Sequence, residues 1–280
     1  MILVFGKTGQ VALEVQRQAD VTALGRDQVD LSDSAACFAA IETHRPALVI
    51  NAAAWTAVDK AEDFEPQAQV INAEAPGAMA RACAAQGVPF LHVSTDYVFD
   101  GSGQTPWCET DPVAPQNAYG RSKQAGEQAV AEAGGQWAVL RTSWVFSAHG
   151  ANFVKTMLRL SETRDQLTVV GDQIGGPTPA ADIAATLLAM GHAMAQGQGG
   201  GIYHYGGQPP VSWAGFAREI FAHAGRATTV TDIPTDQYPT PAKRPLNSRL
   251  DCAKLATDFG ITAPDWKAGL AAVLNELDAS

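Results

Sequence analysis

Only four cysteines occur in the 280 residues, and they are far apart: Cys37, Cys83, Cys108 and Cys252. No two of them have the short spacing of a zinc or redox motif. We therefore expect reduced thiols in a cytoplasmic protein, because disulfides are rare in reducing compartments. No apolar run approaches about 18 residues, so no membrane-spanning helix is expected. The apolar start of the chain ends at Gly6 and lacks the basic residues of a signal peptide.

Positive charge is also scarce. Nineteen Lys and Arg residues face 29 Asp and Glu residues, which gives a formal net charge of −10. Nucleic-acid-binding proteins are usually basic, so no nucleic acid is expected as a partner. An anionic small ligand would need a local group of basic residues. Hydrophobic residues make up 46% of the chain, which is enough for a packed core.

Short apolar runs alternate with longer amphipathic ones through residues 1–145. This alternation predicts an α/β fold, a Rossmann-type doubly wound parallel sheet with both faces covered. The pattern then changes, and 146–280 is expected to form a smaller α+β lobe, mainly substrate-binding and interleaved with the sheet domain. The expected strands are 2–5, 21–24, 47–51, 89–94, 137–143, 167–173 and 202–205. The expected helices are 10–18, 34–44, 66–86, 119–133, 152–160, 180–194 and 266–279.

A glycine turn, FGKTGQVA, follows the first expected strand. Gly6 would allow a tight turn, and Gly9 would let a pyrophosphate approach the helix N-terminus, where free N–H groups favour anions. The third small residue of such fingerprints is Ala12 here. The turn is a weak signal alone, but its position after the first strand indicates a dinucleotide.

The end of the second expected strand normally selects between the two nicotinamide dinucleotides. It carries Gly25 and Arg26 and no acidic residue. An arginine accommodates a 2′-phosphate, so we expect NADPH, with NADH also usable. The alternative is an ordinary surface arginine. Asp30 and Leu31 would border the adenine; alternatively, Asp30 or Ser32 caps the next helix.

The segment NAAA ends the third core strand. Its small residues Ala52, Ala53 and Ala54 would let a flat ligand lie against the backbone at the carboxyl edge of the sheet. Tight packing of a helix is the alternative explanation.

The segment AYGRSK places Tyr119 and Lys123 four residues apart, on one face of an expected helix. An ammonium beside a phenol favours the phenolate, so the lysine is expected to lower the tyrosine pKa. A tyrosine of this kind serves as a general acid or base. The spacing also occurs by chance in many helices, so the neighbouring motifs decide its meaning.

Several motifs occur in order: the glycine turn, NAAAWTAVDKAE, STDYVFDG, YGRSK, RTSWVF, DQIGGPT and YPTPAKRPLNSRL. Together they resemble the extended short-chain dehydrogenase/reductases and, more closely, the dTDP-4-dehydrorhamnose reductase family. The resemblance covers nearly the whole chain. It implies an NAD(P)H-dependent reduction of the C4 ketone of a dTDP-linked 4-keto-6-deoxy sugar, dTDP-4-dehydro-L-rhamnose, to dTDP-L-rhamnose.

The resemblance also implies roles for particular residues. Tyr119 would be the proton donor, Lys123 would hold the nicotinamide ribose, and Thr95 would bind the C4 oxygen of the sugar. The remaining implied positions are Gly9, Gln10 and Val11 at the pyrophosphate, Ala52, Ala53 and Ala54 along the cofactor, Asp96 and Trp144 at the sugar, and Asn152, Lys243, Arg244 and Arg249 at the nucleotide diphosphate. Core packing for the tryptophan and solvated surface charge for Lys243 and the arginines are the alternatives.

Some members of that family bind Mg²⁺ through glutamates at a dimer interface. Glu14 and Glu276 match two such positions, but Ala181 stands at a third, with Asp182 beside it. Two carboxylates suit magnesium less well than three. We therefore expect no metal, while a homodimer remains an open possibility.

Rival functions within the same fold differ at specific positions. Related dehydratases have an acid directly after Thr-Asp, whereas this chain has Tyr97. A 4-epimerase would retain its cofactor tightly and need no net reductant. Another nucleotide-sugar 4-ketoreductase would use the same residues. A non-catalytic NADP-binding regulatory subunit would be expected to have lost the tyrosine–lysine pair, which is intact here.

Overall fold

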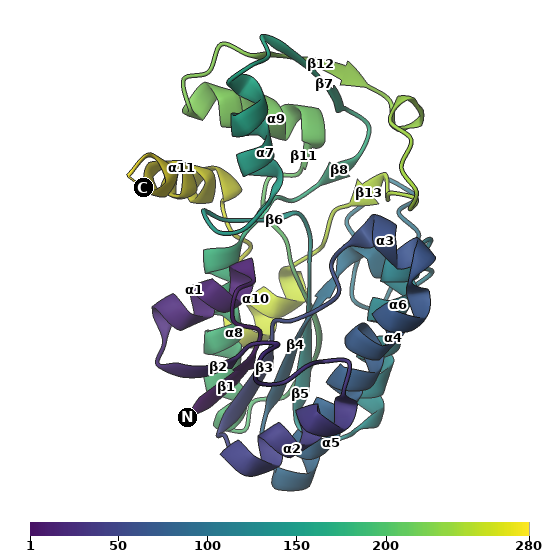
Figure 1. Cartoon of the computed structure of the whole chain (residues 1–280), viewed down its shortest axis with the longest axis vertical. Coiled ribbons are helices and arrows are strands. Elements are labelled where there is room, and N and C mark those ends of the chain that lie inside the picture. Colours follow the sequence, from purple (N-terminus) through teal and green to yellow (C-terminus); the bar gives the residue numbers. More distant parts are fainter. Residues whose placement is uncertain (280) are drawn as a thin grey trace.

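The computed structural model describes residues 1–279. Six strands form one parallel sheet in the order β10-β5-β4-β3-β1-β2, seen in the lower half of Figure 1. The chain starts at β1 inside the sheet and proceeds towards both edges, which is doubly wound topology. This confirms the predicted Rossmann-type α/β fold. The strands are β1 Ile2–Phe5, β2 Val21–Leu24, β3 Leu48–Asn51, β4 Phe90–Thr95, β5 Trp137–Thr142 and β10 Gly201–Tyr205.

Helices cover both faces of this sheet (Figure 1). Alternate strand residues point to opposite faces, so Val4 packs in one core cluster while Leu3 and Phe5 pack in the other. The near-continuous apolar strands are therefore buried on both sides. One face carries α1 Gln10–Gln18, α8 Ala180–Ala195 and α10 Ala253–Phe259; the other carries α2 Ser34–His44, α5 Ala75–Gln86 and α6 Ala118–Glu132.

A second lobe lies beyond the carboxyl ends of the strands (Figure 1). Its core contains Phe146, Phe216 and Trp266. The chain enters this lobe after β5, returns to the sheet for α8 and β10, and enters it again. The lobe consists of α7 Phe153–Ser161, α9 Trp213–His223 and α11 Trp266–Asp278 with the strands β6 Val145–Phe146, β7 Gln166–Val170, β8 Ile174–Gly175, β9 Thr178–Pro179, β11 Val211–Ser212, β12 Thr229–Ile233 and β13 Asn247–Ser248.

Most expected elements occur within one or two residues of their predicted bounds, but the helix predicted at 66–86 is interrupted. It is divided into α4 Glu65–Gln69, a π-helical turn η1 Val70–Glu74, and α5. The buried side chain of Asn72 lies in this turn and holds the backbone of Trp55, accepting from its N–H at 2.8 Å and donating to its carbonyl at 3.1 Å. The helices α3 Val58–Asp63, α9 and α10, and the short turns η2 Asp96–Val98 and η3 Thr235–Gln237, were not predicted.

Candidate active site

The predicted glycine turn and the alanine segment meet at the carboxyl edge of the sheet. Gly6 follows β1 with φ of +112°, a conformation that favours glycine. A Cβ at this position would lie 3.3 Å from both the Ala52 carbonyl carbon and the Ala53 nitrogen. The sequence therefore needs glycine here for two reasons, backbone angle and close packing of the two turns.

Open space lies beside the N-terminus of α1. Gly9 is the N-cap, no side chain caps the helix, and no atom would lie within 4 Å of a Cβ on Gly9. The first N–H groups of a helix have no partner within the helix, so those of Gln10 and Val11 suit a phosphate. This opening fits the pyrophosphate of a dinucleotide cofactor.

Asn152, which the resemblance placed at the nucleotide diphosphate, contacts this same end of α1. Its Nδ2 donates to the Gln10 Oε1 at 2.8 Å, and its Oδ1 accepts from the Lys155 N–H as the N-cap of α7. Ser147 also donates to the Gln10 Oε1, at 2.9 Å. Asn152 thus joins the second lobe to the cofactor helix.

The residues predicted to select the cofactor follow β2. Arg26 and Asp30 are both exposed, and Leu31 is partly buried. The Asp30 carboxylate accepts from the Ser32 N–H, which lowers the Asp30 pKa. The proposed capping of α2 by Asp30 or Ser32 is wrong, because the Asp33 Oδ1 accepts from the Ala36 N–H at the N-cap.

Tyr119 stands in the first turn of α6, facing the end of β4. Its ring meets the Tyr97 ring edge-on, with centroids 5.5 Å apart. Burial raises the Tyr119 pKa, while a hydrogen bond with Thr95 opposes that rise. The Thr95 hydroxyl also accepts from the Tyr97 N–H at 3.2 Å. The tyrosine and the threonine, predicted separately, are thus neighbours at the end of β4.

The expected effect of Lys123 on Tyr119 is not seen in this arrangement. The lysine Nζ donates to the Val93 carbonyl at 2.7 Å and lies 3.0 Å from the His92 Nε2. Burial lowers the Lys123 pKa to about 8. The prediction of a lowered Tyr119 pKa was wrong because burial of the phenol dominates and the amine is turned towards β4. His92 was not singled out from the sequence.

Asp96 is fully enclosed beside these residues. Its carboxylate accepts from the Ser248 hydroxyl on β13 and from the Thr95 hydroxyl. Burial raises the Asp96 pKa to about 6, although both hydrogen bonds lower it. Asp96 therefore links the sheet edge to the second lobe through Ser248.

A cavity of about 490 Å³ opens between this edge and the second lobe. Arg244 lines it and donates to the Asp59 carboxylate at 2.7 Å. Neither Lys243, which donates to Gln116, nor Arg249, which donates to Asn247, is among its lining residues. The sequence reasoning missed several lining residues: Asp59, Tyr97, Arg164, Gln173, Trp213 and Tyr238.

Trp144 follows β5 at the margin of the lobe. It has φ of +48°, which is uncommon for a bulky residue. The Trp144 ring stacks on the Trp213 ring. A Cβ on Gly175 would lie 2.7 Å from the Trp144 ring. Trp144 thus lies between two lobe elements and also packs against the hydrophobic core of the lobe, as the core-packing alternative expected.

The π-helical turn supports α6, the helix that carries Tyr119 and Lys123. Besides holding Trp55, Asn72 donates to the Ser122 Oγ at 2.9 Å. A Cβ on Gly126 would collide with the Asn72 carbonyl oxygen, so the two backbones approach closely. An asparagine inside an apolar helical stretch is the signal that could have indicated this role.

The glutamates considered for magnesium are bound to an arginine. Arg17 donates to the Glu14 carboxylate at 3.1 Å and to the Glu276 carboxylate at 2.9 Å. Within residues 1–279 no group of three His, Cys, Asp or Glu side chains is arranged to hold a metal ion. The guanidinium thus supplies the positive charge between these two carboxylates.

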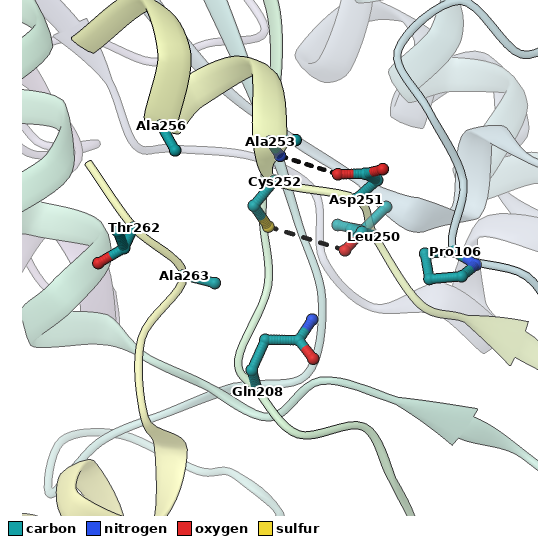
Figure 2. A pocket seen from close by; sticks show the side chains of 9 residues that line it. All are labelled: Pro106, Gln208, Leu250, Asp251, Cys252, Ala253, Ala256, Thr262 and Ala263. Carbon is teal, nitrogen blue, oxygen red and sulfur yellow. Dashed lines mark hydrogen bonds between the residues drawn. The ribbon is translucent and has the colours of Figure 1, made fainter. Parts of the chain in front are cut away.

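A second, open hollow of about 390 Å³ lies at the start of α10 (Figure 2). Asp251 accepts there from the Ala253 N–H at 2.8 Å, and the Cys252 thiol donates to the Leu250 carbonyl. Its lining includes none of the predicted site residues. Across residues 1–279, no helix has both the length and the apolar character needed to cross a membrane.

The parallel sheet, the glycine turn at α1 and the Tyr-x-x-x-Lys pair on α6 define a Rossmann-type short-chain dehydrogenase/reductase, and the chain is an oxidoreductase. The model of the RmlD substrate binding domain family matches residues 1–279. The chain belongs to this family, the dTDP-4-dehydrorhamnose reductases.

Individual relatives agree over nearly full length. The dTDP-4-dehydrorhamnose reductase of Sinorhizobium fredii is 44% identical over 95% of this chain and 94% of its own length. A solved dTDP-4-dehydrorhamnose reductase from Clostridium acetobutylicum is 36% identical, with a TM-score of 0.93 and 99% of each chain covered. Another from Bacillus anthracis, in complex with NADP, is 33% identical, with a TM-score of 0.93 and 98% of each covered.

Proposed function

We propose that this protein reduces the C4 ketone of dTDP-4-dehydro-L-rhamnose to the alcohol of dTDP-L-rhamnose, with NADPH as reductant. The observation that carries the proposal is the position of Tyr119 at the sheet edge, where its ring meets that of Tyr97, a cavity-lining residue, and where Thr95 lies close enough to influence its pKa. The family membership supports the same reaction. When bound, the cofactor supplies a hydride to the ketone carbon.

The chain supplies the proton and the orientation. Tyr119 would donate its phenolic proton to the C4 oxygen as negative charge develops there. Its raised pKa keeps the phenol protonated, as a proton donor must be. Thr95 would hydrogen-bond the same oxygen and hold the sugar in register. Lys123, beneath them, would contact the nicotinamide ribose.

The cofactor would lie along the carboxyl edge. Gly9, Gln10 and Val11 would hold the pyrophosphate at the open helix end. Exposed Arg26 would hold the 2′-phosphate, because a guanidinium matches phosphate geometry. The further residues proposed to border the cofactor are Gly6, Asp30, Leu31, Ala52, Ala53 and Ala54. NADH would be used less well, since it gives Arg26 no phosphate to bind.

The sugar nucleotide would occupy the cavity between the sheet edge and the lobe. Asp96 and Trp144 would border the sugar. Arg244 would contact the diphosphate, and its pairing with Asp59 holds the guanidinium at the cavity wall. Asn152, which bridges to Gln10, would act on the substrate only indirectly, by fixing the lobe against α1.

The two parts of the chain would divide this work. We propose that residues 1–145 bind chiefly the cofactor and residues 146–280 mainly the substrate. We place the protein in the cytoplasm, where its four free thiols would stay reduced. A homodimer remains a prediction that light scattering of the purified protein would test.

The deciding experiment follows NADPH absorbance after the purified protein is mixed with dTDP-4-dehydro-L-rhamnose. We expect oxidation that stops when the substrate is consumed, with dTDP-L-rhamnose as product. Oxidation only with a different 4-keto-sugar nucleotide would correct the substrate. Binding of NADPH with no oxidation of any such sugar would indicate a regulatory subunit instead.

A further inference from the structure

A chain of hydrogen-bonding groups runs behind the site through two fully buried polar residues that the proposed reaction does not use. The Ala53 N–H donates to the Asn51 Oδ1 at 3.1 Å, and the Asn51 Nδ2 lies 3.0 Å from the His92 Nδ1. The other ring nitrogen of His92 lies 3.0 Å from the Lys123 Nζ. Asn51 and His92 are partners in the pairing of β3 with β4. Both are 0% exposed.

The first donor in this chain fixes the direction of the others. A backbone N–H can only donate, so the amide oxygen of Asn51 must face Ala53 and its NH₂ must face His92. The His92 Nδ1 therefore accepts and carries no proton. Burial and the nearby Lys123 lower the His92 pKa well below its usual value, so the ring is neutral. Its one proton must then be on Nε2, pointing at Lys123.

This arrangement suits a neutral Lys123 and conflicts with a charged one. A neutral amine has a lone pair that accepts from Nε2–H, whereas an ammonium group is only a donor. To face an ammonium group, Nε2 must lose its proton and Nδ1 must gain one. The Asn51 amide would then have to turn its oxygen towards His92, which releases the Ala53 N–H.

We propose that His92 is a positioning residue that couples the charge of Lys123 to the orientation of the Asn51 amide. The Asn51 amide in turn determines whether the Ala53 N–H is hydrogen-bonded to the Asn51 Oδ1 or is available to a ligand. Ala53 lies in the turn proposed to border the cofactor, so a ligand that accepts from this N–H favours the charged lysine. The inference rests on the proposed function for the role of Lys123, but the hydrogen-bond chain itself does not.

Other charged groups around Lys123 do not replace this coupling. Glu127, one turn further along α6, raises the Lys123 pKa. Its carboxylate is already held by Arg141, at 2.7 and 2.9 Å, and by the Ser94 hydroxyl at 2.6 Å. Besides the Val93 carbonyl, which does not titrate, His92 is then the side chain hydrogen-bonded to the lysine amine.

The direct test is the tautomer of His92, measured by nitrogen NMR of the histidine-labelled protein without any substrate. We expect the Nε2–H tautomer when Lys123 is neutral and the Nδ1–H tautomer when it is charged, with both changing at one pH. The His92→Gln spectrum assigns the signal. A His92 ring that keeps one tautomer while Lys123 titrates would overturn the coupling, whether or not the protein turns over sugar.

Variants add an independent readout. In Asn51→Asp, the carboxylate accepts from both the Ala53 N–H and the His92 Nδ1–H, so the ring should stay in the Nδ1–H tautomer at every pH. In His92→Gln, the new amide can turn its oxygen to accept from the Lys123 ammonium group, which favours the charged lysine. If loss of the lysine charge causes the fall in kcat at high pH, that fall should then occur about one pH unit higher than in the wild type.

The matched control is His204→Gln, because His204 is also 0% exposed but faces Arg141 and the Trp107 carbonyl. His204→Gln should not change the pH at which kcat falls on the alkaline side. An equal shift in this control would mean that any change in the buried histidines moves the profile, and the coupling would be rejected. If His92→Gln does not fold, the tautomer in Asn51→Asp decides the question; an Nε2–H ring there would also reject the coupling.

Discussion

The indole of Trp144 stacks on the indole of Trp213, with ring centroids 3.5 Å apart and an interplanar angle of 12°. Trp213 begins α9 and lines the lobe cavity, whereas Trp144 follows β5 at the sheet edge. The stack therefore joins the proposed sugar site to the wall of the proposed nucleotide cavity. The stack on Trp213 supports Trp144, whose backbone is in the left-handed region. Such backbone strain is often found at functional sites.

Removing one ring of this stack should weaken substrate binding. We expect Trp213→Ala to raise the KM for the sugar nucleotide about two- to tenfold, the size of a lost ring pair. NADPH binding should not change, since the rings that Trp213 contacts, those of Trp144, Phe153 and Phe216, belong to the lobe or its margin. Trp213→Phe is the conservative control and should recover most of the loss. Equal effects on the Kd for NADPH and on KM would argue for general unfolding of the lobe.

Loss of the Tyr119 hydroxyl should stop proton transfer while leaving the ring packing intact. We expect Tyr119→Phe to lower kcat by roughly 10²- to 10⁴-fold. Fluorescence titration should show nearly normal NADPH binding, since the phenol is proposed to act on the sugar oxygen. A variant that retained the wild-type kcat would remove Tyr119 from the role of acid.

The exposed guanidinium after β2 should discriminate between the two dinucleotides. We expect Arg26→Ala to raise the Kd for NADPH about tenfold, by loss of one charge-assisted contact, and to leave NADH nearly unaffected. Arg226→Ala, at an exposed arginine that follows α9, changes the net charge equally and should affect neither. Parallel losses for both dinucleotides in Arg26→Ala would show that Arg26 does not bind the 2′-phosphate.

Arg244 should matter for the sugar nucleotide and not for the cofactor. Loss of a charge-assisted contact to the diphosphate predicts a KM raised about tenfold to a hundredfold in Arg244→Ala. Arg218→Ala is the matched control, because Arg218 pairs with Asp232 on the surface of the same lobe. Steady-state kinetics with saturating NADPH would measure both. If the two variants behaved alike, the cavity would not be the diphosphate site.

Stability should fall with rising pH because of Asp96. Its folded-state pKa of about 6 exceeds its ordinary value of 3.8, so the folded protein binds this proton more tightly than the unfolded chain does. The contribution is fully present below about pH 4 and is lost as pH rises through about pH 6. A shift of this size corresponds to about 3 kcal/mol.

Asp96→Asn would remove this contribution, since an amide does not ionise. Urea unfolding at several pH values should show the free energy of unfolding of the variant rising relative to that of the wild type, between about pH 4 and about pH 7. The amide has nearly the shape of the carboxyl group, and its oxygen can still accept from the Ser248 hydroxyl. A constant difference between the two proteins over this range would show that the Asp96 pKa is not raised.

The repeating pattern of the first half could be predicted because it depends on local chemistry. The strands β1 to β5 are apolar runs, and the helices between them are amphipathic. The hydrophobic periodicity and the turn residues were therefore sufficient to predict these elements. The π-helical turn at Asn72 could not be predicted this way. It depends on a backbone contact with Trp55 and on the close approach of Gly126, neither of which is local in sequence.

Motifs were sufficient to select candidate site residues, but they did not predict which residues distant in sequence these candidates contact. Tyr119 and Thr95 were assigned separately, and the fold brings them together. Lys123 was expected to act on Tyr119, yet its amine reaches His92 and Val93 on another strand. Asn152 was expected at the nucleotide diphosphate, and the sequence did not indicate its contact with Gln10 at the start of α1.

The sequence by itself determined the doubly wound sheet, the glycine turn and the helix that carries Tyr119 and Lys123. These features depend on hydrophobic periodicity, on the backbone conformations open to glycine and on the spacing of two side chains along a helix, all of which act over a few residues. Only the tertiary structure decided which groups surround Lys123, how Asp96 is enclosed by Ser248, and which lobe residues wall the cavity. Those features depend on contacts between segments that are distant in sequence, with separations of 31 residues for Lys123 and His92 and 152 residues for Asp96 and Ser248. Burial, which sets the pKa values of the site, exists only once those segments are packed together.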